Sequence, residues 1–438
     1  MTATLEFVPE STEGAGEAMH EFMRELFPIC RSITGDGIRQ TLAAVGERIP
    51  LAFTEVPSGT QVYDWTIPPE WNIRDAYIAR TDGRRVVDFR ASNLHVVNYS
   101  EPVHARLSLD ELKGRLHTLP EHPDWIPYRT SYYARSWGFC LTENQLQTLD
   151  EQEYEVVIDS TLEAGSLTYA ECVLPGEKAE EVLFSCHSCH PSLANDNLSG
   201  VALLSWLAQE LSRVPRRLTY RFLFIPGSIG SLTWLARNED RLENVVGGLV
   251  AACVGDPGPL TYKRSRRGDA PIDRAVVHVL EHIDPSATVV DFSPYGYDER
   301  QFNSPGFDLP VGSLTRTPHG HFPQYHTSAD DLEFVRPEFL ERSLQAYLAV
   351  VDVLENDRRY LNTNPKGEPQ LSKRGLYPTT GGKDAAVEQL AMLWVLNLAD
   401  GAHSLLETAE RAQLPFSIIR TAASRLRDVG LLVEAVNA

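Results

Sequence analysis

The chain has 438 residues, of which 42% are hydrophobic and 23% charged, a composition that excludes a disordered or low-complexity protein. Its formal net charge of −20 disfavours a general binder of nucleic acid or anionic membranes, because both need surplus positive charge. No apolar run approaches the roughly 18–20 residues of a membrane span, and the N-terminus shows no signal-peptide pattern. Six thinly scattered cysteines favour free thiols, so we expect a cytoplasmic protein that contacts neither nucleic acid nor membrane.

The first part of the chain changes character along its length. Residues 17–27 carry apolar side chains at helical spacing, and residues 51–100 hold short alternating runs separated by Pro, Gly and Asn, which predicts a small β-rich unit. From residue 153 onward, strand-like apolar runs alternate with helix-like segments; the runs are 154–158, 181–185, 218–225 and 247–255, and the segments include 198–212 and 231–235. This alternation predicts an α/β domain with a largely parallel sheet.

The C-terminal part has its own pattern. Residues 357–378 are polar and are the best linker candidate, and three short helices are expected at 385–398, 404–413 and 418–429, followed by a strand from Gly430. This order is typical of a winged helix. Residues 384–438 carry four basic and seven acidic side chains, a net charge of −3, which disfavours DNA binding and favours a scaffold or dimerisation role.

The densest candidate site is the segment Cys186-His-Ser-Cys189-His190 through Asn195-Asp196-Asn197 to Gly200. It follows a predicted strand and leads into a predicted helix, and such loops line the ligand crevice of an open α/β sheet. His190 and Asp196 can reach one zinc ion, because imidazole and carboxylate are both good zinc ligands. The segment also matches the haem-attachment string Cys-x-x-Cys-His, but no export signal supports haem attachment and no second cysteine pair supports a zinc ribbon. Buried strand-end thiols are the preferred interpretation of Cys186 and Cys189.

Two further strand ends supply matching groups. Asp256 follows the run 247–255, and His326 lies in a loop before another helix-like stretch. Each alone is more typical of a surface Asp or a structural His. Together with His190 and Asp196, they form a His/Asp/Asp/His set at the ends of strands in one sheet.

The pattern His190…Asn195-Asp196-Asn197-x-Ser-Gly200, then Asp256, then Tyr325-His326-Thr, resembles the zinc-dependent aminopeptidase superfamily that also contains the glutaminyl cyclases. It is most similar to bacterial aminopeptidase-like proteins with a C-terminal winged helix, which are often associated with polysaccharide or secondary-metabolite gene clusters. The similarity covers nearly the whole chain through Arg31-Ser-Ile-Thr-Gly-Asp-Gly37, Asp64-Trp65-x-x-Pro-x-Glu70-Trp71, Trp137-Gly-Phe-Cys140, Cys189-His-Pro-Ser192, Gly255-Asp-Pro-Gly258 and Asp298-Glu-Arg-Gln301…Pro310-Val-Gly-Ser313.

The resemblance implies a mixed, mostly parallel sheet flanked by helices, with a small β-rich inserted domain and a C-terminal winged-helix domain. The expected domains are residues 1–50 with 126–365, residues 51–125, and residues 370–438. It also implies that His190 and Asp256 hold one metal ion, that His326 belongs to a second, and that Asp196 bridges them.

The sequence departs from the superfamily where its peptidases carry adjacent glutamates, one a general base and one a metal ligand. The corresponding segment here is Pro226-Gly227-Ser228, so we expect one zinc ion rather than two and weakened peptidase activity. Asp298 and Glu299 are candidate catalytic substitutes, with a surface salt-bridge cluster as the equal alternative. Arg316 could bind a substrate carboxylate and Tyr325 could orient the site, although structural roles are the simpler explanation of both.

Three functions fit these observations. The first is a metal-dependent hydrolase of a peptide-like or amide bond in a small biosynthetic intermediate. The second is a catalytically degenerate zinc-binding member with a ligand-binding or scaffold role. The third, a winged-helix regulator, is disfavoured by charge. The expected partners are a small-molecule or peptide-like substrate and a second copy of the chain, joined through the β-rich or winged-helix domain.

Overall fold

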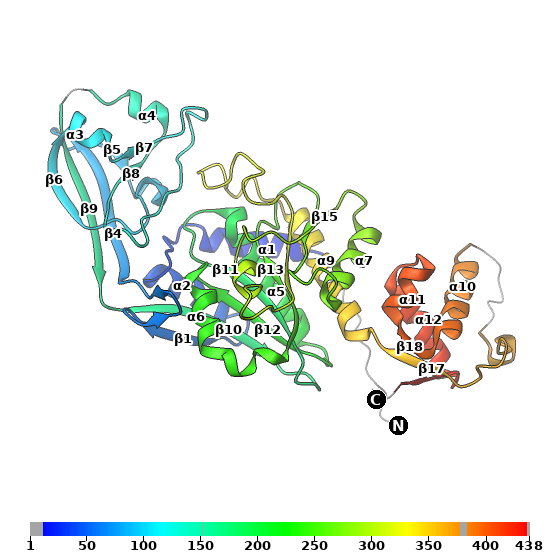
Figure 1. The fold of residues 1–438 in the computed structure, drawn as a ribbon. Coiled ribbons are helices and arrows are strands. Elements are labelled where there is room, and N and C mark those ends of the chain that lie inside the picture. Colours follow the sequence, from blue (N-terminus) through cyan, green and yellow to red (C-terminus); the bar gives the residue numbers. More distant parts are fainter. Residues whose placement is uncertain (1–11, 151, 377–382, 436–438) are drawn as a thin grey trace.

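The computed structural model describes residues 12–150, 152–376 and 383–435. Its centre is an eight-stranded mixed sheet in the order β1-β10-β12-β11-β13-β16-β14-β15 (Figure 1). The strands are β1 (Ala52–Pro57), β10 (Ser166–Leu174), β12 (Thr219–Ile225), β11 (Glu181–His187), β13 (Val245–Ala251), β16 (Val311–Thr315), β14 (Thr261–Lys263) and β15 (Thr288–Val290). The four consecutive strands β12, β11, β13 and β16 run parallel, so their carboxyl ends meet at one edge of the sheet.

Helices cover both faces of this sheet, because its central strands are apolar on both sides. Every residue of β11 is buried, with Val182 and Phe184 in one hydrophobic core and Leu183 in the other. The helices of the α/β domain in the first core are α1 (Ala15–Leu26), α2 (Asp36–Gly46), α5 (Ser199–Ser212), α7 (Pro271–Ile283) and α9 (Pro337–Asn356). Helices α6 (Ile229–Asn238) and α8 (Glu299–Phe302) belong to the second. The predicted α/β fold with a mostly parallel sheet is confirmed.

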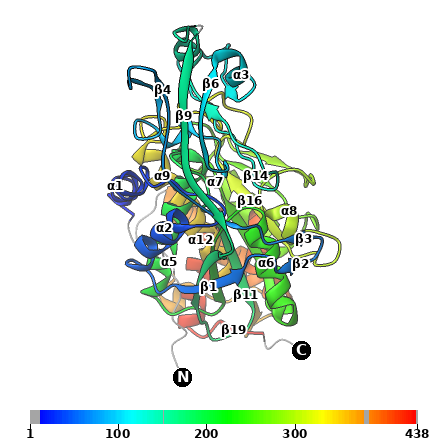
Figure 2. The same ribbon diagram turned by 90° about the vertical axis from the view of Figure 1, so that its left-hand side faces the viewer.

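A four-stranded antiparallel sheet, in the order β5-β4-β9-β6, projects from the main sheet as an arm (Figure 2). Its strands are β4 (Glu70–Arg80), β5 (Arg85–Asp88), β6 (Val103–Ser108) and β9 (Glu153–Glu163). Smaller elements accompany it: β2 (Gln61–Val62), β3 (Trp65–Thr66), β7 (Leu116–His117), β8 (Phe139–Cys140), α3 (Leu109–Lys113), α4 (Glu143–Gln147) and the turn η1 (Asn93–His95).

Strand pairing crosses the domain boundaries that we expected from the sequence. β9, assigned to the α/β domain, pairs with β4 and β6 in the arm. β1, assigned to the inserted unit, pairs with β10 in the main sheet. The physical reason is that alternating apolar residues predict that a strand is present but do not identify the strand with which it pairs. That pairing depends on contacts between residues distant in sequence.

The C-terminal part has the layout of a winged helix. Helices α10 (Lys383–Leu398), α11 (Leu405–Ala412) and α12 (Phe416–Asp428) accompany a sheet of β18 (Asp400–Ser404), β17 (Arg359–Asn362) and β19 (Leu432–Glu434). On α12, Arg420 pairs with Asp352 of α9 and Arg425 with Glu388 of α10. These ion pairs reduce the free positive charge of α12.

Two other expectations concern cysteines and membrane spans. All six cysteines are free, as predicted, and five of them are buried. Among the residues described, no helix is long and apolar enough to cross a membrane.

Glu355 joins the last turn of α9 to the start of β12. Its carboxylate, only 4% exposed, accepts hydrogen bonds from the backbone N–H groups of Arg217 (2.7 Å) and Leu218 (3.0 Å) and from the Tyr220 hydroxyl (2.8 Å). One carboxylate thereby accepts from three donors, of which the Leu218 N–H and the Tyr220 hydroxyl are buried. The contact ties the helix layer to a central strand.

Glu355→Gln should lower the free energy of unfolding by about 1–3 kcal/mol, because an amide cannot accept at both ends and leaves at least one of these donors unpaired. Urea unfolding measures the change. The matched control is Glu243→Gln, at an exposed position, expected within about 0.5 kcal/mol of wild type. Equal stabilities of the two variants would contradict this role of Glu355.

Candidate metal centre

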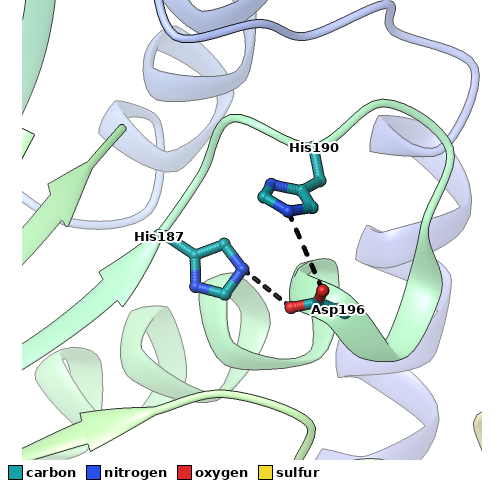
Figure 3. A group of neighbouring side chains, drawn as sticks. All are labelled: His187, His190 and Asp196. Carbon is teal, nitrogen blue, oxygen red and sulfur yellow. Dashed lines mark hydrogen bonds and ion pairs between the residues drawn. The ribbon is translucent and has the colours of Figure 1, made fainter. Parts of the chain in front are cut away.

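Three side chains from one short segment, residues 187–196, converge at the carboxyl end of the parallel strands. His187 is the last residue of β11, His190 lies in the following loop, and Asp196 lies in the short turn η2 (Ala194–Leu198) that precedes α5. Figure 3 shows both imidazoles pointing toward the Asp196 carboxylate. One potential ligand atom from each residue lies within 4.8 Å of the others, which is close enough for a single ion after small side-chain movements.

His326, in the loop between β16 and α9, also contacts the Asp196 carboxylate. The Nε2 atom of His187 lies 2.7 Å from Asp196 Oδ1, and the Nε2 atoms of His326 and His190 lie 3.0 and 3.8 Å from Asp196 Oδ2. Asp196 is fully buried. Burial alone would raise its pKa, but the neighbouring charge of His187 and hydrogen bonds from His187 and His326 outweigh burial and hold the pKa well below its usual range. The group therefore offers three imidazoles around one ionised carboxylate.

The loop that carries these side chains is fixed from several directions. Asp330 accepts hydrogen bonds from the backbone N–H groups of Asn195 (2.6 Å) and Asp196 (2.9 Å). Burial raises the pKa of Asp330 to about 8. The Arg31 Nε atom donates to the His190 carbonyl oxygen (2.8 Å), so the buried arginine of the Arg31–Gly37 motif braces the loop.

His326 has an unusual backbone conformation. Its φ of 57° lies in the left-handed region, which costs a non-glycine residue energy unless its surroundings hold it there. The backbone N–H of Tyr128 donates to the His326 carbonyl (2.8 Å), and the Tyr325 ring stacks on the imidazole with centroids 4.0 Å apart. These contacts hold the imidazole toward Asp196.

The structure does not bring Asp256 into this group, contrary to our expectation. Asp256 is buried, but its Oδ1 accepts from the Gly258 N–H (2.8 Å) and the Thr317 hydroxyl (2.5 Å), and its Oδ2 accepts from the Asn195 side-chain amide (3.0 Å). Between the end of β13 and Asp256, Cys253 takes a positive φ of 51°, which redirects the chain. The Asp256 carboxylate thus supports the loop instead of joining the histidines.

His187 takes a place in the group that sequence reasoning missed. The expected strand ended at residue 185, whereas β11 continues to His187, which pairs with Ile225 of β12. Both histidines are visible in the string Cys186-His187-Ser-Cys189-His190, but only the second was chosen as a metal-ligand candidate. A strand-end histidine next to a loop histidine is the pattern that would have found it.

Asp298 and Glu299 lie beside the group, at the start of α8. One oxygen of the buried Asp298 accepts from the Ser231 hydroxyl (2.9 Å), and the other, Oδ2, has no hydrogen-bond partner among the described residues. Burial raises the pKa of Asp298 to about 6, against the opposing charge of His187. Glu299 is also buried and forms an ion pair with Lys263. The alternative of a surface salt-bridge cluster is excluded by this burial.

Asp298 also faces Gly227, the position that lacks the expected glutamate. A Cβ atom built on Gly227 would lie 3.3 Å from Asp298 Oδ2 and 3.1 Å from His187 Cβ. The Asp298 carboxylate therefore lies next to Gly227, and His187 borders the same space.

Arg316 does not face an open site. It is 4% exposed, its Nε donates to the Gly258 carbonyl (2.9 Å), and its guanidinium lies 4.7 Å from the Phe339 ring centroid. The expected role in binding a substrate carboxylate is therefore replaced by a structural one, because its donors point into the protein. Tyr325, by contrast, contacts the site through its stack on His326.

A large cavity lies next to the same loop, with Ser192 in its lining. It has a volume of about 930 Å³, and its lining includes Cys30, Trp71, Ser192 and Ser328 but not His187, His190 or Asp196. The group of His187, His190 and Asp196 is thus not part of the lining of this cavity.

The donor set fits a zinc ion. Imidazoles and an ionised carboxylate are ordinary zinc ligands, and burial lowers the pKa of His190 well below its usual range, which favours its neutral form. The Asp298 oxygen without a partner is a further buried acceptor in the neighbourhood. His187, His190 and Asp196 therefore form a candidate zinc site, and His326 contacts the same carboxylate.

Fold and site together define an aminopeptidase-like protein. The zinc aminopeptidase BSAP of Bacillus subtilis shares the fold, with a TM-score of 0.59 and 13% identity over 79% of this chain and 95% of BSAP. A family model described as a domain of unknown function, DUF4910, matches residues 20–357, and a winged helix-turn-helix model matches residues 358–434. The chain belongs to the DUF4910 family and ends in a winged helix-turn-helix domain, which confirms the predicted winged helix.

A relative from Clostridium acetobutylicum covers almost the full length. It is named "Putative polysaccharide biosynthesis protein with aminopeptidase-like domain" and is 52% identical over 427 residues, 97% of this chain and 98% of the relative. A crystal structure of a "putative peptidase" from the same organism matches with a TM-score of 0.92 and 51% identity, over 96% of this chain and 98% of that one. The resemblance stated from the sequence is thereby confirmed.

Proposed function

We propose that this chain is a metal-dependent hydrolase of a peptide-like or amide bond in a small biosynthetic intermediate. The observation that carries the proposal is the convergence of His187, His190 and His326 on Asp196, beside the buried carboxylate of Asp298. The aminopeptidase-like fold supports the bond type. The name of the Clostridium relative supports a biosynthetic context.

We propose that the four converging residues hold one zinc ion. Such an ion, when bound, polarises a carbonyl and makes water a stronger nucleophile near neutral pH. A second ion at this group would be short of ligands, because Gly227 has no side chain and the oxygens of Asp256 are already engaged.

Within this proposal, Asp298 is the general base. Ser231 fixes one carboxylate oxygen, and the second oxygen remains available to take a proton from the attacking water. Glu299, held by Lys263, places a further negative charge next to it, and Tyr325 keeps the His326 ring in place by stacking. A positioned base of this kind contributes about 10²–10⁴-fold in rate.

The second candidate is a member that binds zinc and ligand without turnover. The observation that favours it is Gly227, since the usual base is absent from that position. The two proposals differ in whether Asp298 supplies the missing basicity.

Zinc-loaded protein should hydrolyse chromogenic aminoacyl anilides slowly, and Asp298→Asn should reduce the rate by about 10²-fold or more. Asparagine can still accept from Ser231, so the change removes basicity while keeping the hydrogen bond. The control is Asp82→Asn, in an exposed turn of the arm, which should match wild type. Removal of metal by chelation should abolish the activity, and zinc should restore it. Zinc-loaded protein with no measurable turnover would favour the second candidate.

A further inference from the structure

A second group of potential metal ligands lies on α7, away from the site described above. His278, Glu281 and His282 each offer one ligand atom, and these atoms lie within 4.8 Å of one another. The spacing explains the grouping, because residues three and four positions apart share one face of a helix. Figure 1 shows α7 on the side of the α/β domain that faces α11 of the winged helix.

The hydrogen bonding of these histidines points to a missing ligand. His278 is only 3% exposed, yet neither ring nitrogen has a hydrogen-bond partner among the described residues. An unpaired buried polar group is unfavourable, so native proteins rarely leave one without a protein, water or ion partner. A bound cation would supply a partner for the ring nitrogen that carries the lone pair.

His282 is oriented to bind through its outer nitrogen. Its Nδ1 atom lies 2.7 Å from the His278 carbonyl oxygen. A carbonyl can only accept, so Nδ1 carries the proton and Nε2 keeps its lone pair. A histidine held in this way by a backbone carbonyl is a typical metal ligand.

Space for an ion and its remaining ligands is present at the same place. A cavity of about 510 Å³ is lined by His278, Glu281 and His282 from α7 and by Glu410 and Gln413 at the end of α11. Arg274, one turn earlier on α7, pairs with Glu410 (2.5 Å) across the same boundary. The cavity therefore lies at the seam between the α/β domain and the winged helix.

We propose that His278, Glu281 and His282 form a second metal site, for a borderline divalent cation such as Zn²⁺, which stabilises the structure at this seam. Two imidazoles with one carboxylate are the donors that such cations prefer. The site takes no part in the proposed hydrolysis, since it belongs to α7 and not to the carboxyl ends of the parallel strands.

Zinc content of the full-length protein tests the proposal. Metal-stripped wild type, reloaded with Zn²⁺ and desalted, should retain one more equivalent than His278→Ala/His282→Ala under the same treatment. His282→Gln, at a half-buried position, should lose the same equivalent while its amide can still donate to the His278 carbonyl, which guards against loss by misfolding. The control is His104→Ala, an exposed histidine beside Glu155, which should bind as much zinc as wild type.

A thermal melt gives an independent readout. Zn²⁺ should raise the midpoint of His187→Ala, in which the first site is impaired, and this increase should vanish when His282→Gln is added. Zinc content and zinc-dependent stabilisation that are unchanged by His282→Gln and by the double alanine variant would overturn the proposal. Because both readouts are independent of catalysis, failure of the proposed hydrolase function would leave this result interpretable.

Discussion

Asp196→Ala should remove zinc from the group of His187, His190 and His326, with a loss of affinity greater than about 100-fold. Loss of a partner outside the ligand shell already costs about 10–100-fold, and Asp196 is the carboxylate on which all three imidazoles converge. Alanine also removes the negative charge that offsets the positive charge of a bound zinc ion. Elemental analysis and zinc titration of the purified variant measure the loss.

Asp256→Asn is the matched control for this prediction. Asp256 is likewise a buried carboxylate after a central strand, but its oxygens are used by Gly258, Thr317 and Asn195. We expect Asp256→Asn to lower stability while keeping the zinc affinity of the first site. If Asp256→Asn lost as much zinc as Asp196→Ala, Asp256 would have to be returned to the ligand set. Asp196→Asn has nearly the shape of the wild-type side chain but no charge. Loss of zinc in a folded Asp196→Asn protein would therefore come from the lost ligand charge and not from misfolding.

Gly227→Glu should reduce hydrolysis by at least about 10-fold instead of restoring an ordinary peptidase. From the sequence alone, a glutamate at this position supplies the missing base. In the structure, its Cβ would lie 3.3 Å from Asp298 Oδ2 and 3.1 Å from His187 Cβ, so the new carboxylate would crowd an existing one. Two like charges in a buried site repel, and the variant should also melt at a lower temperature.

A double variant tests whether the two positions share one role. Asp298→Ala alone should lose about 10²–10⁴-fold in rate, and Gly227→Glu combined with Asp298→Ala should recover at least about 10-fold of that loss. Gly227→Ala is the control, because it adds the Cβ without the charge. No recovery in a folded, zinc-loaded double variant would show that the two carboxylates are not interchangeable.

Much of the candidate site was predictable because strand ends are visible in sequence. His190, Asp196 and His326 follow apolar runs, and parallel strands bring their carboxyl ends together. His187 was missed because the end of β11 was placed two residues too early, and strand boundaries are poorly determined by hydrophobic pattern. Motif position gave Asp256 its expected role, yet the positive φ of Cys253 redirects that loop, and no pattern of residue types reveals this.

The fold, like the site, was predictable from the sequence only in part. Burial on both faces of β11, β12 and β13 appears as continuous apolar runs, so the central sheet was predictable. The partner of β9 was not, because alternation describes a half-buried strand equally well in either sheet. Arg316 illustrates a similar limit for side chains: its charge suggested a substrate, while its actual partners, Gly258 and Ser343, lie far away in the sequence.

The arm cannot be removed without affecting the site, because residues 126–128 contact the loop that carries His326. These residues lie between the arm strands β6 and β9 in the sequence. Residues 126–128 exchange hydrogen bonds with residues 326–328: Ile126 with Ser328 in both directions, and Tyr128 with the His326 carbonyl. The Tyr128 ring also contacts both His190 and His326, with centroids 5.1 Å apart in each case. A shortened chain would have to keep residues 126–128. A deletion should therefore remove only part of the four-stranded sheet, not all the residues from its first strand to its last.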